Sequence, residues 1–355
     1  MKALLPSVLS LFAAPALAGL LGLYTPLAEA DAVKEIRIAV PDVSAGPKHS
    51  GAGISDVLYT RELLEKEFAA DGIHISWSYF KGAGPAVNEA FANGQVDFAY
   101  LGDLAAIIGK SSGLDTRLLA ATARGVNHYL GVQPGSGIKT LADLKGKRVG
   151  IFRGTASQLS FDNALAGAGL SEKDLKVINL DFSAALAALA AKQIDATWGL
   201  AGLFALRAKG LAEIPLSTRD LGGAGTLQAV LVGNGAFVDA HPDLTERLLK
   251  VQLQALGWST TPANHDAFVQ LVSDQAGYPP VILQTEFQDR PLADVLSPKL
   301  DADFLGKLEA SVKAARQYGL IRRDFTVAEW AQPRYLDAAS AAVQGSSAAV
   351  ASNNR

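Results

Sequence analysis

The chain has 355 residues, a formal charge of −3 and no cysteine. Without cysteine it can form no disulfide, no thiolate metal site and no lipid-modified N-terminal cysteine, and without a Lys/Arg cluster it is not expected to bind nucleic acid. Its length predicts two globular units, because single cores rarely grow beyond about 250 residues.

The first thirty residues have the pattern of a secretory signal peptide. Lys2 is followed by an apolar run over residues 4–23, and residues 27–30 form a small-residue cleavage site. Cleavage after residue 18 and an uncleaved membrane anchor are the alternatives. The pattern favours a cleaved signal peptide, so we expect a periplasmic protein without a lipid anchor.

Strand-like and helix-like segments alternate along the rest of the chain. The first series has strands at 36–40, 73–79 and 96–100, with helices at 55–69 and 86–93. The second has strands at 148–152, 175–179 and 194–198, with helices at 156–168 and 184–192. This order predicts an α/β protein with two mainly parallel, doubly wound sheets. Ala90–Asp97 also resembles Ala188–Asp195, as expected for two units of one architecture.

Two more strand-like segments, 128–132 and 227–232, are interpreted as hinge strands that cross between the lobes. Helices at 242–258, 264–275 and 302–317 follow. The predicted organisation is a signal peptide at 1–30, a first lobe from 31–127 and 234–336, a second lobe with the hinge strands at 128–233, and a disordered tail at 337–355.

Three loops that lead into helices are candidates for ligand binding. In a parallel sheet, ligands bind outside the carboxyl ends of the strands, where helix N-termini offer free N–H groups and partial positive charge. Two such sheets facing each other would bind a sulfonate, sulfate or carboxylate without clustered Lys or Arg. The three loops are Ser50-Gly51-Ala52-Gly53, Gly102-Asp103 and Arg153-Gly154-Thr155-Ala156-Ser157.

Several of these side chains have a second interpretation. Thr155 could simply cap its helix. Trp198, at the end of a strand, either covers the organic part of a ligand or belongs to the core, and His128 is more often a structural residue. Asp103 would repel an anion, so it would orient Arg153, accept a hydrogen bond from a ligand amine, or hold its own loop.

The predicted ligand-binding set therefore has twelve members: Gly51, Ala52, Gly53, Gly102, Asp103, Arg153, Gly154, Thr155, Ala156, Ser157, Trp198 and His128. No nucleophile elbow, phosphate-binding Gly-Lys-Ser/Thr loop or metal-spaced His pair occurs in the sequence. We therefore predict no catalytic residues, no cofactor and no metal site.

Several segments resemble the aliphatic-sulfonate, taurine and nitrate-type solute-binding proteins of ABC transporters. Thr140–Val149 is similar to the stretch that opens the second lobe in periplasmic binding proteins. Gly102-Asp103 and Gly154–Ser157 resemble the ligand loops of the sulfonate branch, and 289–291 and 330–333 resemble its C-terminal segments. The resemblance covers roughly residues 35–336. It implies a type II, two-lobed fold and a monomer that closes on a small anion, expected to be an aliphatic sulfonate, for a permease and ATPase complex.

Two departures from the family pattern leave the ligand open. The chain carries extra residues around Asp42–His49, and it has Trp198-Gly199-Leu200-Ala201 where the family often has a Trp-Asp-Pro-Tyr-like segment. Taurine, nitrate, a sulfate ester and a pyrimidine precursor remain alternative ligands. A cleft enzyme and a sensor module on the same fold are alternative functions. The synthase branch of this fold uses a cysteine-rich motif, which this chain lacks.

Overall fold

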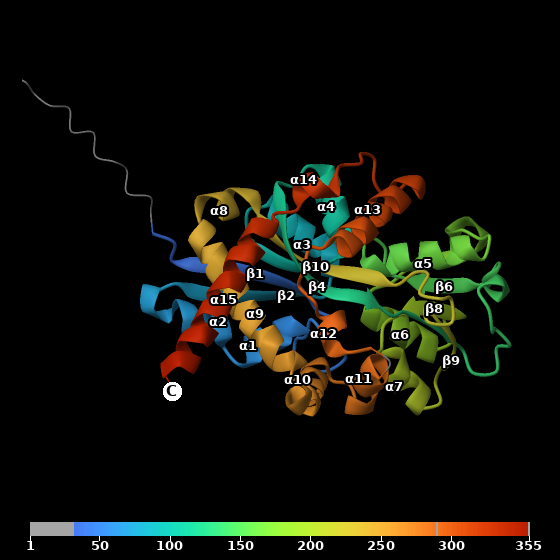
Figure 1. Cartoon of the computed structure of the whole chain (residues 1–355). Coiled ribbons are helices and arrows are strands. Elements are labelled where there is room, and N and C mark those ends of the chain that lie inside the picture. The colour runs from blue at the N-terminus through green and yellow to red at the C-terminus, as the bar shows by residue number, and fades with distance from the viewer. Residues whose placement is uncertain (1–31, 289, 354–355) are drawn as a thin grey trace, which may run out of the picture. The chain divides into compact units, whose positions relative to one another are not determined.

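The computed structural model describes residues 32–288 and 290–353, so the predicted signal peptide at 1–30 lies outside the described residues. From Lys34 onward the chain forms one unit. This unit is built on two five-stranded sheets flanked by helices (Figure 1). None of the helices in the described part is long and apolar enough to cross a membrane.

The first sheet has the strand order β2-β1-β3-β10-β4. Strand β1 is parallel to β2 and β3, whereas β10 is antiparallel to β3 and β4. The strands are β1 (Glu35–Pro41), β2 (His74–Phe80), β3 (Phe98–Gly102), β4 (Thr116–Val126) and β10 (Leu227–Asn234).

The second sheet repeats this arrangement in the order β7-β6-β8-β5-β9. Strand β6 is parallel to β7 and β8, and β5 is antiparallel to β8 and β9. The strands are β5 (Tyr129–Val132), β6 (Arg148–Ile151), β7 (Lys176–Asn179), β8 (Ala196–Gly199) and β9 (Glu213–Ser217). The prediction of an α/β protein with two mainly parallel sheets is confirmed, although β4 and β9 were missed.

The same ion pair holds the central strands of both sheets. The Arg37 backbone N–H donates to the Asp97 carboxylate at 2.8 Å, and its guanidinium reaches the same carboxylate at 2.6 Å. In the second sheet Arg148 and Asp195 make the equivalent contacts at 2.8 and 2.7 Å. The likeness of Ala90–Asp97 to Ala188–Asp195 therefore extends to side-chain geometry.

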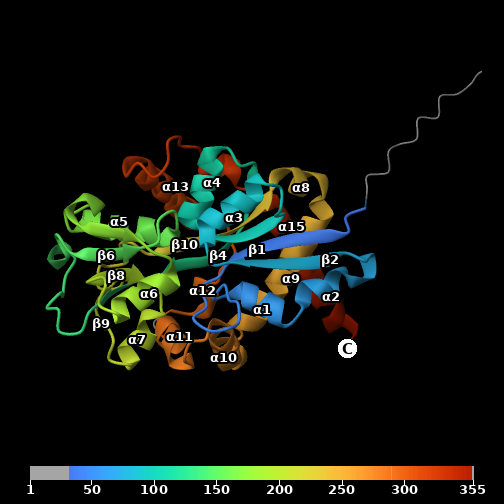
Figure 2. The same cartoon turned by 180° about the vertical axis from the view of Figure 1, so that it is seen from behind.

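The helices that connect the strands cover both faces of the sheets, as the two opposite views show (Figures 1 and 2). In the first two thirds of the chain they are α1 (Ile54–Thr60), α2 (Leu63–Phe68), α3 (Ala83–Ala92), α4 (Asp103–Ser112), α5 (Ala156–Gly167), α6 (Phe182–Ala190) and α7 (Leu203–Ala208). Single 3₁₀ turns lie at Ala69–Asp71, Ala142–Leu144, Glu172–Asp174 and Pro262–Asn264. The helix predicted at 55–69 is two helices, because Glu62 adopts a left-handed conformation with φ of 52°.

The C-terminal third is helical: α8 (Gly235–Ala240), α9 (Pro242–Thr260), α10 (His265–Ala276), α11 (Pro280–Phe287), α12 (Leu292–Val295), α13 (Ala302–Gln317), α14 (Val327–Trp330) and α15 (Pro333–Asn353). Most of these helices pack beside the first sheet. Helix α11 does not, because Ile282 packs in the core of the second sheet with Tyr129 and Phe204. The predicted first lobe, which included residues 280–287, is corrected at this helix.

Neither of the two predicted hinge strands crosses between the sheets, since β5 pairs with β8 and β9 inside the second sheet. Residues 227–234 pair with β3 and β4 along their length, so β10 belongs to the first sheet and is not a crossing strand. The crossings are instead short segments at 127–128 and 218–226. They contact each other where the Thr218 hydroxyl donates to Asn127 at 2.9 Å and the Thr218 amide donates to the His128 carbonyl at 2.9 Å.

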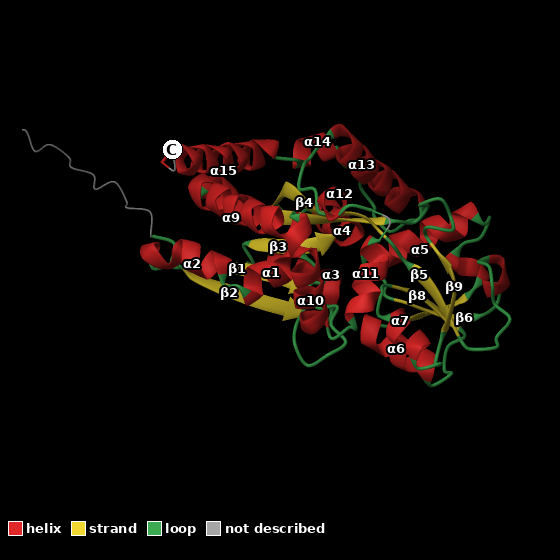
Figure 3. Cartoon of the chain, turned by 60° about the horizontal axis from the view of Figure 1, so that its bottom comes forward, coloured by secondary structure: helices red, strands yellow, loops and turns green. Residues whose placement is uncertain are grey.

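The predicted disordered tail begins in a helix. Helix α15 packs against α9 (Figure 3), and Tyr335, Leu336 and Ala339 are buried. An Ala-rich sequence favours the helix. The regularly spaced apolar residues at its start bury one face, which is what stabilises a helix in a protein.

Candidate ligand site between the two sheets

A cavity of about 230 Å³ is lined by strands of the first sheet and by loops and helix starts that follow strands of the second sheet. Its walls include the carboxyl end of β1 at Val40 and Pro41, the end of β3, and the start of α5. This is the edge of a parallel sheet where ligands are expected. The cavity is therefore the candidate functional site.

The three loops predicted from the sequence meet at this cavity. Seven of the twelve predicted residues line it: Gly51, Ala52, Gly53, Gly102, Thr155, Ala156 and Ser157. The second and third loops follow strands of different sheets and are in close contact, since a Cβ placed on Gly102 would lie 2.6 Å from the Ala156 Cβ. Whether these residues bind a ligand stays a prediction.

Helices α4 and α5 both begin at the cavity without a side-chain cap. The Thr155 hydroxyl donates to the Phe152 carbonyl at 2.7 Å, so it does not cap α5 as the alternative interpretation supposed. The first-turn N–H groups of such helices need acceptors, and the helix dipole favours a negative one. The start of α5 can therefore act as a donor to an anionic group, whereas the Leu104 amide at the start of α4 already donates to Asp103 at 2.8 Å.

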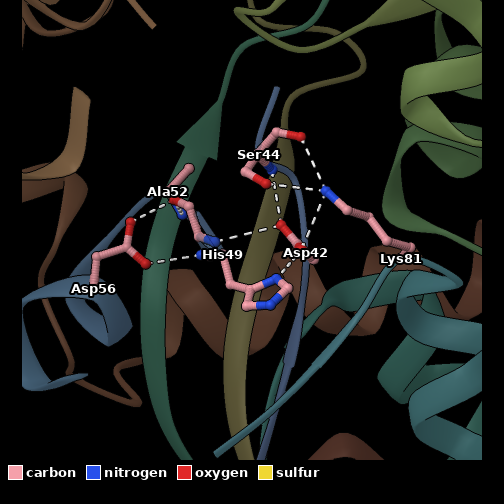
Figure 4. Close-up of polar contacts among 8 residues, drawn as sticks. Asp42, Ser44, His49, Ala52, Asp56 and Lys81 are labelled. Atoms are coloured by element: carbon pink, nitrogen blue, oxygen red, sulfur yellow. Dashed lines mark hydrogen bonds and ion pairs between the residues drawn. The ribbon is translucent and has the colours of Figure 1, made fainter. Parts of the chain in front are cut away.

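The first loop is held by a buried acid that the sequence analysis missed. The Asp56 carboxylate accepts from the Ser50 hydroxyl at 2.5 Å and from the Gly51 amide at 2.8 Å (Figure 4). Burial raises the pKa of Asp56 to about 7. Because Gly51 already donates to this carboxylate, the loop contributes wall rather than a free amide. The sequence feature that could have predicted this role is an acidic residue in the first turn of the predicted helix, where its carboxylate can accept from backbone amides at the start of the helix.

Asp103 holds its own loop, one of the three roles considered for it. It is 3% exposed and is not part of the cavity wall. Its carboxylate accepts from the Leu104 amide at 2.8 Å, the Gln228 amide at 3.3 Å and the Ser311 hydroxyl at 3.2 Å. Burial raises the pKa of Asp103 to about 6.

Arg153 and Gly154 lie outside the cavity wall. The Arg153 guanidinium is half-exposed and pairs with Glu172 at 2.6 Å, so Asp103 does not orient it. Gly154 has a positive φ of 75° and donates its amide to the Gln158 side chain at 2.8 Å. Its role is to shape the turn into α5, for which glycine is suited.

Trp198 belongs to the core, which settles its two alternatives. It is 2% exposed, it is absent from the cavity wall, and its indole N–H donates to the Ser160 hydroxyl at 2.8 Å. His128 is fully buried one layer behind the cavity, with Nε2 2.7 Å from the Ser157 hydroxyl oxygen. Burial lowers the pKa of His128 to about 3, so the ring is neutral.

Helices α11 and α12 supply a part of the wall that the sequence analysis did not find. Leu283, Phe287, Val295 and Leu296 make this part of the wall apolar. Glu286 adds one carboxylate, which accepts from the Tyr129 hydroxyl and, at 2.9 Å, from the Asn127 side-chain amide. The local sequence does not predict that α11 and α12 line the cavity, because this depends on where these helices pack in the folded chain.

The extra loop at Asp42–His49 is ordered around one buried carboxylate. Asp42 accepts from His49 at 2.7 Å and pairs with Lys81 at 3.2 Å (Figure 4). Burial alone would raise the pKa of Asp42, but hydrogen bonds from His49, Ser44 and Lys81 bring it to about 2. The Tyr278 hydroxyl donates to the Val43 carbonyl at 2.7 Å, which ties the loop to the chain ahead of α11. Val43 thereby reaches the cavity wall.

The cavity has an uncommon charge pattern for an anion site. Among the described residues, no Lys or Arg lines it, and Glu286 is its one carboxylate. The described part of the chain also contains no cluster of three His, Asp or Glu side chains able to hold a metal ion. A negative ligand group would therefore be bound by N–H and O–H dipoles.

Comparison with curated proteins finds relatives of similar length. A binding protein of Brucella abortus (strain 2308) is 28% identical over 239 residues, which cover 66% of this chain and 71% of that protein. A Bacillus subtilis protein named for binding aliphatic sulfonates is 25% identical over 75% of this chain and 77% of its own length.

Comparison with solved structures finds the same fold. The crystal structure of the periplasmic sulfonate-binding protein SsuA from Methylobacillus flagellatus has a TM-score of 0.74 and 28% identity, covering 88% of this chain and 96% of that one. A desulfurization enzyme, DszB, has a TM-score of 0.63 at 17% identity, covering 86% of this chain and 98% of that one. The fold alone is therefore shared by binding proteins and an enzyme.

A protein-family model gives the assignment. The model described as NMT1/THI5 like matches residues 68–264, more than half of the chain. The matched segment includes the starts of α4 and α5 and most of the second sheet. The two-sheet fold, the paired loops and this match together show that the chain belongs to the NMT1/THI5-like family.

Proposed function

We propose that this protein binds a small organic anion, an aliphatic sulfonate, in the cavity between its sheets. The observation that carries the proposal is the meeting, at one cavity, of loops that follow strands of both sheets, where α5 begins without a side-chain cap. A sulfonate group has three oxygens that only accept hydrogen bonds, which suits donors that come from backbone N–H and hydroxyl groups.

The organic part of the ligand would lie against the apolar wall. Leu283 and Phe287 of α11 and Leu296 after α12 line the cavity together with Phe182 of α6. Burial of an alkyl chain is worth about 0.8 kcal/mol per CH₂ group. The proposal therefore favours a sulfonate with a short hydrocarbon chain over bare sulfate or nitrate.

We further propose that the protein works in the periplasm as a monomer and delivers the ligand to a permease and ATPase complex without changing it. The names of the Methylobacillus and Bacillus relatives support this role. Contacts from both sheets would stabilise the form in which the sheets close on the ligand, and the transporter would recognise that form.

Two measurements test the proposal. Native mass spectrometry of freshly purified protein should show a retained mass in the range of a small sulfonate. Isothermal titration calorimetry should show saturable binding of 1-butanesulfonate, weaker binding of sulfate and nitrate, and recovery of the ligand unchanged. A flat titration with all sulfonates would remove the ligand assignment. Release of sulfite from a sulfonate or sulfinate would instead indicate an enzyme.

A further inference from the structure

His128 contacts the cavity only through Ser157. Its imidazole is fully buried and does not line the cavity, and its Nε2 lies 2.7 Å from the Ser157 hydroxyl oxygen. Ser157 is the second residue of α5 and does line the cavity. The ring plane is held by Trp198, which stacks on it at 6.2 Å between centroids and 13° between planes. His128 is therefore a fixed group one layer behind the site.

The other ring nitrogen determines which tautomer is present. Within the described residues, His128 Nδ1 has no hydrogen-bond partner. A neutral imidazole has one N–H and one lone pair. A buried N–H without an acceptor is among the rarest features of folded proteins, whereas an unused lone pair is tolerated more often. The proton is therefore on Nε2, and Nε2–H donates to the Ser157 oxygen.

This assignment sets the direction of the Ser157 hydroxyl. A serine hydroxyl has one proton and can otherwise either donate or accept. Because its oxygen accepts from His128, its proton points elsewhere. In the described part of the chain the hydroxyl has no acceptor of its own. The remaining direction is toward the cavity, where the proton would meet a ligand oxygen.

We propose that His128 is a specificity-determining positioning residue, which makes Ser157 a hydrogen-bond donor to the ligand. The site then selects a group whose atoms only accept hydrogen bonds, such as a sulfonate. It discriminates against a group that presents its own N–H or O–H, such as a sulfonamide. The inference rests on the proposed binding of a sulfonate and adds the residue pair that enforces its selectivity.

The test compares 1-butanesulfonate with 1-butanesulfonamide by isothermal titration calorimetry on the full chain. A hydrogen bond to a charged group contributes about 1.5–3 kcal/mol, so His128→Leu should weaken sulfonate binding by about 10- to 100-fold. Binding of the sulfonamide should change by less than about threefold, so the selectivity ratio falls. His128→Gln, whose side-chain N–H can replace Nε2–H, should recover most of the ratio.

A second arm separates this role from a structural one. Ser157→Ala should lower the ratio as much as His128→Leu, and adding His128→Leu to Ser157→Ala should change it no further, because the histidine acts through the serine. If His128→Leu does not fold, the Ser157→Ala variant alone tests the inference. An unchanged ratio of sulfonate to sulfonamide affinity in Ser157→Ala would then overturn it. Equal weakening of both ligands by His128→Leu also overturns it. If the unaltered protein binds no sulfonate, the proposed function fails first and the inference fails with it.

Discussion

Gly102, at the end of β3, lies so close to Ala156, the first residue of α5, that a Cβ built on Gly102 would be 2.6 Å from the Ala156 Cβ. Gly102 belongs to the first sheet, Ala156 begins the helix that follows β6 of the second sheet, and both residues line the cavity. Gly102 has an ordinary φ of −71°, so an alanine there would meet no backbone strain. The small size of Gly102 matters because β3 and the start of α5 approach each other closely at this point.

Gly102→Ala should therefore weaken ligand binding while the protein still folds. The added methyl group would push α5 away from β3 and move the two helix starts apart, and misplaced donors lose much of a charge-assisted hydrogen bond. We expect about a 10-fold or greater rise in Kd for 1-butanesulfonate, measured by calorimetry.

The matched control is Gly167→Ala at the end of α5, where an added Cβ meets nothing within 4 Å. This variant should bind like the unaltered protein. Equal affinities for Gly102→Ala and Gly167→Ala would mean that the approach of the two sheets does not matter for binding.

Glu286→Gln should strengthen binding of a simple sulfonate. The carboxylate lines the cavity, and the described wall contains no Lys or Arg, although Arg219 donates to the Glu286 backbone carbonyl at 2.6 Å from outside the wall. The Glu286 charge therefore opposes an anionic ligand. Removing the repulsion between this partly buried carboxylate and the ligand anion should make the binding free energy more favourable by about 1 kcal/mol. This corresponds to roughly a fivefold fall in Kd at low salt. Calorimetry at two ionic strengths would measure it.

Glu329→Gln, an exposed acid on α14, is the control and should leave Kd unchanged. A loss of affinity in Glu286→Gln would point to a ligand that carries a cationic group near this carboxylate. In that case taurine should bind the unaltered protein more tightly than 1-butanesulfonate does, as measured by calorimetric titration.

Arg153→Ala should leave ligand binding within about twofold. The guanidinium is half-exposed, pairs with Glu172 and does not line the cavity. An exposed ion pair contributes about 0–1 kcal/mol, so the unfolding free energy in urea should fall by no more than that. A tenfold loss of affinity for 1-butanesulfonate would show that Arg153 reaches the ligand after all.

Asp162→Asn should make stability less dependent on pH. Asp162 on α5 is 8% exposed, and burial raises its pKa to about 7, with Glu172 adding to the shift and Arg153 opposing it. Its pKa in the unfolded chain is about 3.9, so the folded state binds more protons between these values. The unfolding free energy therefore falls as pH rises from about 4 to about 7.

Urea denaturation at pH 5 and pH 8 measures the effect. The decrease between the two pH values should be smaller in Asp162→Asn by about 1–4 kcal/mol. Asp324→Asn, an exposed acid, is the control and should keep the decrease of the unaltered protein. An undiminished decrease in Asp162→Asn would show that the ionisation of Asp162 does not oppose folding.

The local sequence determined the strands, most helices and the positions of the loops. The segment 96–102 is a short, mainly apolar run that ends at a glycine before a helix, and this pattern requires only neighbouring residues. The repeated order placed Gly53 and Thr155 at equivalent points of the two sheets, each after the first strand of its series and before a helix. Strand β4 was not predicted, because its Ala-rich composition favours a helix as much as a strand.

Only the tertiary structure decided which side chains face the cavity. Trp198 and Arg153 were placed correctly along the chain, yet one side chain turns into the core and the other toward Glu172. Glu286 reaches the wall because α11 packs on the second sheet, more than 150 positions from Tyr129. Hydrophobic periodicity indicates which face of a helix or strand is buried. The direction of a long side chain depends instead on which distant element packs against it.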